Sequence, residues 1–89
     1  MNALLPLVQA GLIQPNTTVT WRRRGGKVLT AIVKADGSLT TSDGKTYRTP
    51  SGAARHFTGR PIDGWNVWAT PDGRRLSELR ELIGGSASE

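Results

Sequence analysis

Three glycine-containing turns divide the segment between Thr17 and Tyr47 into short runs, and this punctuation limits what the chain can fold into. The first two runs, Thr17–Arg24 and Lys27–Ala35, are rich in Thr and Val and alternate with a period of two. Gly-Gly and Asp-Gly pairs between alternating runs are hairpin signals. The segment therefore predicts a meander of four short antiparallel strands, complete by Thr49. The turns are expected at Gly25-Gly26, Asp36-Gly37 and Asp43-Gly44.

Helices are expected before and after these strands along the chain. Asn2–Ala10 carries apolar residues at helical spacing and is followed by Gly11, where a C-terminal cap would lie. Pro50–Phe57 predicts a short central helix, and Arg75–Ile83 a closing helix. We expect the apolar residues of the closing helix to point inward. They are Leu76, Leu79, Leu82 and Ile83.

The remaining segments are a short extended stretch at Gly64–Thr70 and a turn at Pro71–Gly73. With 89 residues the chain fits one small domain. We place this α+β domain at residues 1–83 and expect a flexible polar tail at residues 84–89.

Positive charge is concentrated in the first two thirds of the chain. Between Thr18 and Arg60 there are nine basic residues and two acidic ones, whereas residues 61–89 hold three Arg and five acidic residues. A clustered basic surface is typical of polyanion binders, although an Arg-rich soluble surface is the plain alternative. The densest cluster is at the first hairpin: Arg22, Arg23, Arg24 and Lys27.

The start of the central helix offers a second basic site. Thr49 before Pro50 is an N-cap arrangement, and the first turn would expose the Ser51 hydroxyl and free backbone N–H groups at the positive end of the helix dipole. This arrangement could seat a phosphate, or it could be an ordinary capped helix with solvated arginines. The site residues are Arg48, Thr49, Ser51, Gly52, Arg55 and His56.

The aromatic residues are few, so their placement matters. Trp65 and Trp68 could stack on exposed bases, but a chain with only five Phe, Trp and Tyr residues needs its large rings in the core, where we expect both. Trp21 alternates with Val19 on the first strand and should face inward or half-inward, as should Tyr47. Trp21 and Tyr47 are the candidates for contact with a base.

Catalysis, metal binding and cofactor binding have little support. The single His56 lacks the Ser or carboxylate spacing of a triad, there is no Cys, and Gly25-Gly26 does not have the spacing of a nucleotide-binding loop. We expect no catalytic residue, no metal and no cofactor. The lack of Cys makes the cytoplasm the default location, and the apolar stretch at residues 1–13 is too short to cross a membrane.

Five short motifs follow one another along the chain. They are Gly11-Leu12-Ile13, "AxVxxDGxL" at Ala31–Leu39, "DGxxYxxPSxAA" at Asp43–Ala54, "GW" with a second Trp at Gly64–Trp68, and "LxxLR" at Leu76–Arg80. These motifs and their order resemble a known family, the RAMA domain, which is named for its association with restriction enzymes and adenine methylases. The resemblance covers nearly the whole chain. This chain has Thr-Pro-Ser at residues 49–51 and Asp-Gly-Trp at residues 63–65, where the family commonly has Ser-Pro-Ser and Asn-Gly-Trp.

The resemblance implies a role in recognising DNA, including modified DNA such as that carrying N6-methyladenine, beside a nuclease or methylase partner or fused domain. We therefore expect a non-catalytic module for double-stranded DNA, in which the hairpin and the helix start face the DNA. A protein-interaction module within a restriction or phage-defence assembly is the alternative, with the terminal helices as its surface. A nucleic-acid enzyme is disfavoured by the residue inventory.

Overall fold

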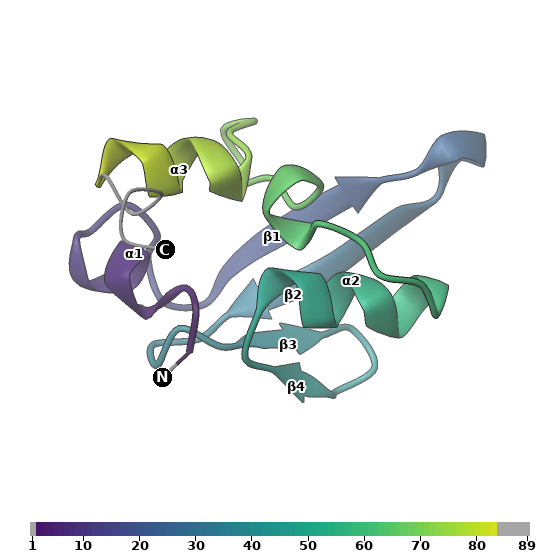
Figure 1. The fold of residues 1–89 in the computed structure, drawn as a ribbon, viewed down its shortest axis with the longest axis horizontal. Coiled ribbons are helices and arrows are strands. Elements are labelled where there is room, and N and C mark those ends of the chain that lie inside the picture. The colour runs from purple at the N-terminus through teal and green to yellow at the C-terminus, as the bar shows by residue number, and fades with distance from the viewer. Residues whose placement is uncertain (1, 84–89) are drawn as a thin grey trace.

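The computed structural model describes residues 2–83 and arranges them around a four-stranded antiparallel sheet in the order β1-β2-β3-β4 (Figure 1). The predicted α+β class and the meander are confirmed. The predicted tail at residues 84–89 lies outside the described residues. The strands are β1 (Thr17–Arg22), β2 (Val28–Val33), β3 (Leu39–Thr41) and β4 (Thr46–Tyr47).

Strands β1 and β2 form the longest hairpin, paired from Thr17↔Val33 to Arg22↔Val28. A short 3-10 turn, η1 (Arg24–Gly26), joins them, and the Arg23 N–H donates to the Lys27 carbonyl at 2.7 Å to close it. Both of its glycines have φ of +79°. That region is strained for residues with a Cβ, so the turn depends on the glycine pair.

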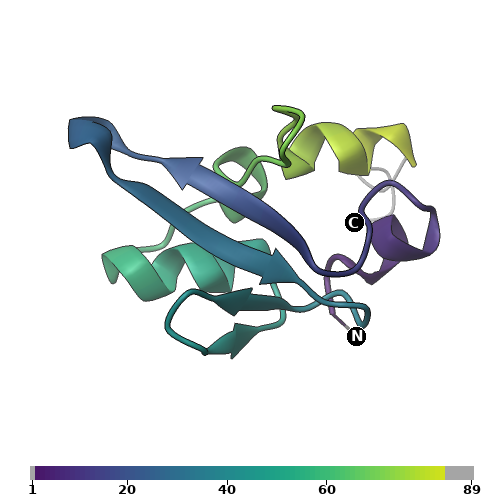
Figure 2. The same ribbon diagram turned by 180° about the vertical axis from the view of Figure 1, so that it is seen from behind.

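One face of the sheet is buried and the other is open. Val19, Ala31 and Val33 alternate toward the core, and α2 (Pro50–Thr58) packs on that side. Figure 2 shows the opposite face, on which none of the helices within residues 2–83 lies. This alternation of buried and exposed residues is the pattern expected of an antiparallel sheet with a single covered face.

The helices α1 (Leu5–Gln9) and α3 (Leu76–Leu82) lie together at the end of the molecule away from the β1–β2 turn (Figure 1). The first helix is shorter than the predicted Asn2–Ala10. Its expected first residues bond to other parts of the fold instead: the Ala3 N–H donates to the Arg48 carbonyl and the Leu4 N–H to the Gly37 carbonyl. N–H groups at a helix start have no partner within the helix, so these two tertiary bonds satisfy them and hold the segment before α1 against the rest of the fold.

Trp68 is the centre of the core, fully buried, with its indole N–H donating to the Pro50 carbonyl at 3.0 Å. The extended segment predicted at Gly64–Thr70 is wrong in its first half. Residues Gly64–Asn66 form the 3-10 helix η2, because the Asp63 carboxylate accepts from the Trp65 N–H at 3.1 Å and caps it. Within the predicted segment only Ala69 pairs in strand fashion, with Thr20 and with Arg75.

The inward placement predicted for Leu82 and Ile83 is also wrong. Leu76 and Leu79 are buried, but Leu82 is 61% exposed and Ile83 39% exposed. A spacing of three residues turns about 60° short of a full circle at each step, so Leu82 lies roughly 120° away from Leu76. Ile83 points in the same direction as Leu76 but follows the last helical residue, beyond the part of α3 that contacts the core.

Candidate nucleic-acid interface

The tip of the β1–β2 hairpin projects away from the rest of the molecule, as Figures 1 and 2 both show. We call residues 22–28 the basic arm. Every residue of this segment is exposed, and none is acidic. Within residues 2–83, the ion pairs join His56 to Asp43 and Arg74 to Asp72, so no arm cation is paired there. The four cations are Arg22, Arg23, Arg24 and Lys27.

The two faces of the arm differ. Alternation along β1 places Arg22 on the open face of the sheet and Arg23 on the same side as Trp21. The Arg23 guanidinium lies over the Trp21 ring, 5.1 Å from its centroid, and the Trp21 ring meets Trp68 in a T-shaped contact at 5.9 Å. Trp21 is half-buried, as predicted, and it borders an open hollow lined otherwise by the arm cations. Trp21 therefore links Arg23 of the arm to Trp68 of the core.

The start of α2 is capped as predicted. Thr49 has extended backbone angles, and its hydroxyl accepts from the Gly52 N–H at 2.9 Å. The open N-terminus expected there is not what the structure has, because η2 covers it. The Ser51 hydroxyl is half-buried and accepts from the Gly64 N–H at 3.0 Å, and a Cβ on Gly64 would lie 2.1 Å from the Pro50 carbonyl.

The basic residues beside this helix start remain accessible. Arg48 and Arg55 are exposed. Arg55 lines a shallow hollow together with Ser51, Gly52 and Asp63. The Asp63 carboxylate brings negative charge to the hollow that was proposed to seat a phosphate. The structure thus separates the predicted site residues into an all-cationic arm and a helix start of mixed charge.

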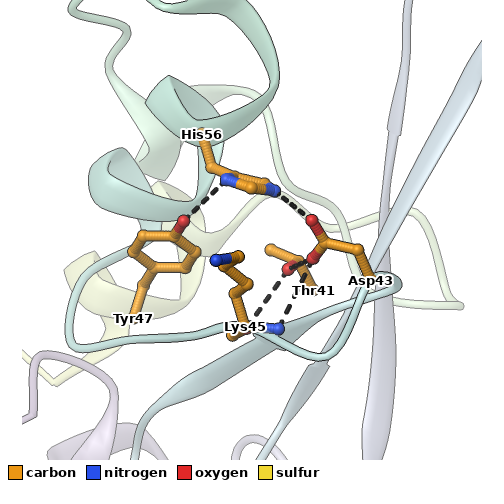
Figure 3. Close-up of polar contacts among 5 residues, drawn as sticks. All are labelled: Thr41, Asp43, Lys45, Tyr47 and His56. Carbon is orange, nitrogen blue, oxygen red and sulfur yellow. Dashed lines mark hydrogen bonds and ion pairs between the residues drawn. The ribbon is translucent and has the colours of Figure 1, made fainter.

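His56 lies in a polar cluster that the sequence did not predict (Figure 3). Its Nδ1 lies 2.7 Å from the Tyr47 hydroxyl, and its Nε2 lies 2.5 Å from an Asp43 carboxylate oxygen. The Asp43 partner was missed because Asp43-Gly44 was interpreted as a turn signal alone. Thirteen residues separate Asp43 from His56, and no local pattern links them. Tyr47, a candidate for base contact, is half-buried with its hydroxyl held by His56.

The hydrogen bonds of this cluster can be satisfied in both protonation states of His56. With a neutral ring, the Tyr47 O–H donates to Nδ1 and Nε2–H donates to Asp43; with a charged ring, Nδ1–H donates to the Tyr47 oxygen. The Thr41 hydroxyl donates to the other Asp43 oxygen. That bond, followed by the contact with His56, holds the pKa of Asp43 below its usual range. The cluster therefore acts as a clamp between the β3–β4 turn and α2.

Neither a metal-binding cluster nor a membrane-spanning helix is found in the described part of the chain. No three His, Cys, Asp or Glu side chains of residues 2–83 converge as they would around a metal ion. No helix within the same residues has the length and apolar character needed to cross a membrane.

The chain matches a family model. The model of a family described as "RAMA: Restriction Enzyme Adenine Methylase Associated" matches residues 3–86. A search among curated proteins finds no match. The matched range contains all the described elements, from α1 through the basic arm and α2 to α3.

Proposed function

Because the chain belongs to the Restriction Enzyme Adenine Methylase Associated family, we propose that it is a non-catalytic module that binds double-stranded DNA through its basic arm. The basic arm is the observation that carries the proposal. It presents four exposed cations with no acidic residue among them and no ion pair to another described residue. Unpaired Arg and Lys side chains are free to neutralise phosphates and release condensed counterions.

Residues around the start of α2 would assist DNA binding by the arm. Arg48 and Arg55 would contact the phosphate backbone beside it and fix the register of the protein on the duplex. The clamp of Asp43, His56 and Tyr47 would hold α2 rigid against the sheet during binding. Delivering DNA to a nuclease or methylase, as a partner or a fused domain, is the role that fits the family's description.

We further propose that the module favours DNA carrying N6-methyladenine. This methyl group projects into the major groove, where a side chain of the arm can contact it. Burial of one methyl is worth about 0.8 kcal/mol, so the preference should be roughly fourfold. Equal affinities for matched duplexes with and without the modification, in salt that suppresses non-specific binding, would remove this part of the proposal.

Salt dependence tests the DNA-binding function itself. We expect duplex affinity, measured by fluorescence anisotropy, to fall with salt at a log–log slope of about −0.9 for each phosphate contacted. Replacing the four arm cations by Ala should reduce the magnitude of the slope by up to about 3.6. Arg74→Ala is the matched control, because Arg74 already pairs with Asp72 at 3.5 Å. Absence of binding at low salt, or binding indifferent to salt, contradicts the proposal.

One observation favours a protein-interaction module as a second candidate. Leu82 and Ile83 expose apolar surface at the end of α3, away from the arm. Replacing both by Ser separates the candidates. Unchanged DNA affinity in that variant, together with loss of affinity in the arm variant, supports the DNA-binding module.

A further inference from the structure

Val28 is an apolar residue in a place where nothing buries it. It is the last residue of the basic arm, it is 53% exposed, and it pairs directly across the hairpin from Arg22. Residues opposite each other on an antiparallel pair point to the same face, with Cβ atoms about 5 Å apart. The base of the arm therefore presents a guanidinium and a branched apolar side chain side by side on the open face of the sheet.

The dimensions of the arm suit one groove of DNA. Beyond the half-buried pair Trp21↔Leu29 the two strands continue as a paired ribbon to Arg22↔Val28, and the turn Arg24–Gly26 closes them. The major groove of B-DNA is about 8.5 Å deep and about 12 Å wide and admits a two-stranded ribbon, whereas the minor groove is only about 6 Å wide. A ribbon that lies along the major groove with its open face toward the floor would bring Arg22 and Val28, which share that face, to the base edges.

From this geometry we propose that Arg22 and Val28 read neighbouring base pairs in the major groove, an inference that rests on the proposed DNA binding. Arg22 would donate two hydrogen bonds to O6 and N7 of a guanine. Val28 would contact a base methyl group, either at C5 of thymine or at N6 of a methylated adenine. Successive bases are about 3.4 Å apart along a strand, which the separation of the two side chains can span.

A second exposed apolar residue on the same face provides a matched control. Ile32 is 37% exposed and pairs with Thr18 on β1 and Thr40 on β3. It lies on the body of the sheet, four residues along β2 from Val28, and outside the basic arm. A general effect of apolar surface on binding would involve Ile32 as much as Val28. A methyl contact made by the arm involves Val28 alone.

The test compares three pools of random duplexes with the same base-pair composition: one with thymine, one with uracil in its place, and one with thymine and N6-methyladenine. Each pool is titrated against the whole chain and against Val28→Ser and Ile32→Ser, in salt that suppresses non-specific binding. Val28→Ser removes both methyl groups and leaves the side chain uncharged. We expect the whole chain to favour a methyl-bearing pool by up to about fourfold, Val28→Ser to lose that preference, and Ile32→Ser to keep it.

The three pools also identify the source of the methyl group. A preference for thymine over uracil assigns the contact to thymine C5, and a preference that appears only with N6-methyladenine assigns it to adenine. Equal binding of all three pools by the unmodified chain overturns the inference, as does a preference that survives in Val28→Ser or is lost equally in Ile32→Ser. Failure of the chain to bind any pool at low salt overturns the DNA-binding function as well.

Arg22 is tested by keeping its charge. Arg22→Lys retains one positive charge but loses the planar pair of donors, so the salt slope should stay unchanged. The preference for a pool with guanine over one with 7-deazaguanine, which lacks the N7 acceptor and so removes one of the two hydrogen bonds, should fall by about tenfold. Arg24→Lys in the turn is the control and should keep this preference. The inference fails for Arg22 if both variants behave alike.

Discussion

At the scale of single residues, the hydrogen-bond partners of His56 and Trp68 explain much of the local order. His56 has both ring nitrogens engaged, with Asp43 on one side and Tyr47 on the other. Trp68 is fully buried and still satisfies its indole N–H, on the Pro50 carbonyl. His56 thus links α2 to the sheet and its β3–β4 turn, and Trp68 links the segment after η2 to the start of α2. The stability of the fold should depend on the polar atoms that make these bonds.

Asp43→Asn should make the protein less sensitive to acid. The Thr41 hydroxyl and His56 hold the pKa of the Asp43 carboxyl below its usual range. A carboxyl with a lowered folded-state pKa stabilises the protein above its unfolded pKa of about 3.9, and this contribution is lost as pH falls through the lower folded value. Urea denaturation between pH 7 and pH 3 should therefore give a shallower acid loss of the unfolding free energy in Asp43→Asn.

Glu81→Gln, at an exposed position of α3, is the control and should keep the acid loss of the unmodified chain. Part of that loss should persist even in Asp43→Asn, because two other turn carboxyls have lowered pKa values for the same reason. The Ser38 hydroxyl lowers the pKa of Asp36, and the Thr70 hydroxyl lowers that of Asp72. An unaltered acid profile in Asp43→Asn would show that the clamp does not stabilise the fold.

Trp68→Phe should destabilise the protein more than Trp65→Phe. The first substitution leaves a void in the core and removes the donor to the buried Pro50 carbonyl, a loss of about 1–3 kcal/mol for the hydrogen bond alone. Trp65 is half-buried, with the Arg80 guanidinium 4.2 Å above its ring, an interaction that Phe can partly keep. Thermal unfolding of both variants measures the difference, and equal losses would contradict the central role given to Trp68.

At the scale of elements, the junction of α2 and η2 changes how the helix start can function. The cap at Thr49 and the proline at the first helical position form as local rules predict. The following segment then folds back so that Gly64 packs against Pro50 and donates to Ser51. A helix start that sequence alone presents as open is therefore an internal contact between two elements.

Gly64→Ala should disrupt this junction. Its Cβ would lie 2.1 Å from the carbonyl carbon and oxygen of Pro50, so backbone must move, at a loss of about 1–3 kcal/mol or more. Gly52→Ala, within α2, is the matched control. Its nearest atom is the Thr49 hydroxyl oxygen at 3.1 Å, and a helical position gains roughly 0.5–1 kcal/mol from Ala. Chemical denaturation of the two variants should give clearly different midpoints, and similar midpoints would mean that η2 does not close the helix start.

At the scale of the whole molecule, the distribution of charge separates two basic regions. The arm carries cations alone, while Arg55 shares its hollow with Asp63. The attraction of a phosphate to Arg55 is reduced by this nearby carboxylate. In the arm, Arg22 shares a hollow with Glu78, whereas Arg23, Arg24 and Lys27 line a hollow that has no acidic residue. The projecting arm should therefore provide most of the electrostatic contact with DNA.

Paired substitutions test this division. Arg22→Ala with Arg24→Ala should reduce the magnitude of the salt slope by about 1.8, and Arg48→Ala with Arg55→Ala should reduce it less. All four positions are exposed, so each substitution should change stability by no more than about 0.5 kcal/mol. Salt titrations of both variants, with melting temperatures measured in parallel, distinguish lost contacts from lost folding. A larger effect of the helix pair would place the DNA on α2 instead.

Local chemistry in the sequence was sufficient to determine the strands and turns of the sheet and the start of α2. Gly25-Gly26 and the two Asp-Gly pairs specify turns through their tolerance of positive φ, and the alternation along β1 and β2 specifies which side chains are buried. Thr49 and Pro50 specify where α2 begins. The basic character of the arm is also a property of consecutive residues. Each of these features acts within a few residues along the chain, so the sequence displays it directly.

Only the tertiary structure decided how these elements meet. It brought Asp43 to His56 across thirteen residues, covered the start of α2 with Gly64, and left Leu82 exposed where a simple apolar spacing predicted burial. It also made the β1–β2 turn an arm by carrying it past the helices. The physical reason is that such contacts depend on the distance between elements in space, which is set by the packing of the whole core around Trp68 and not by any local pattern.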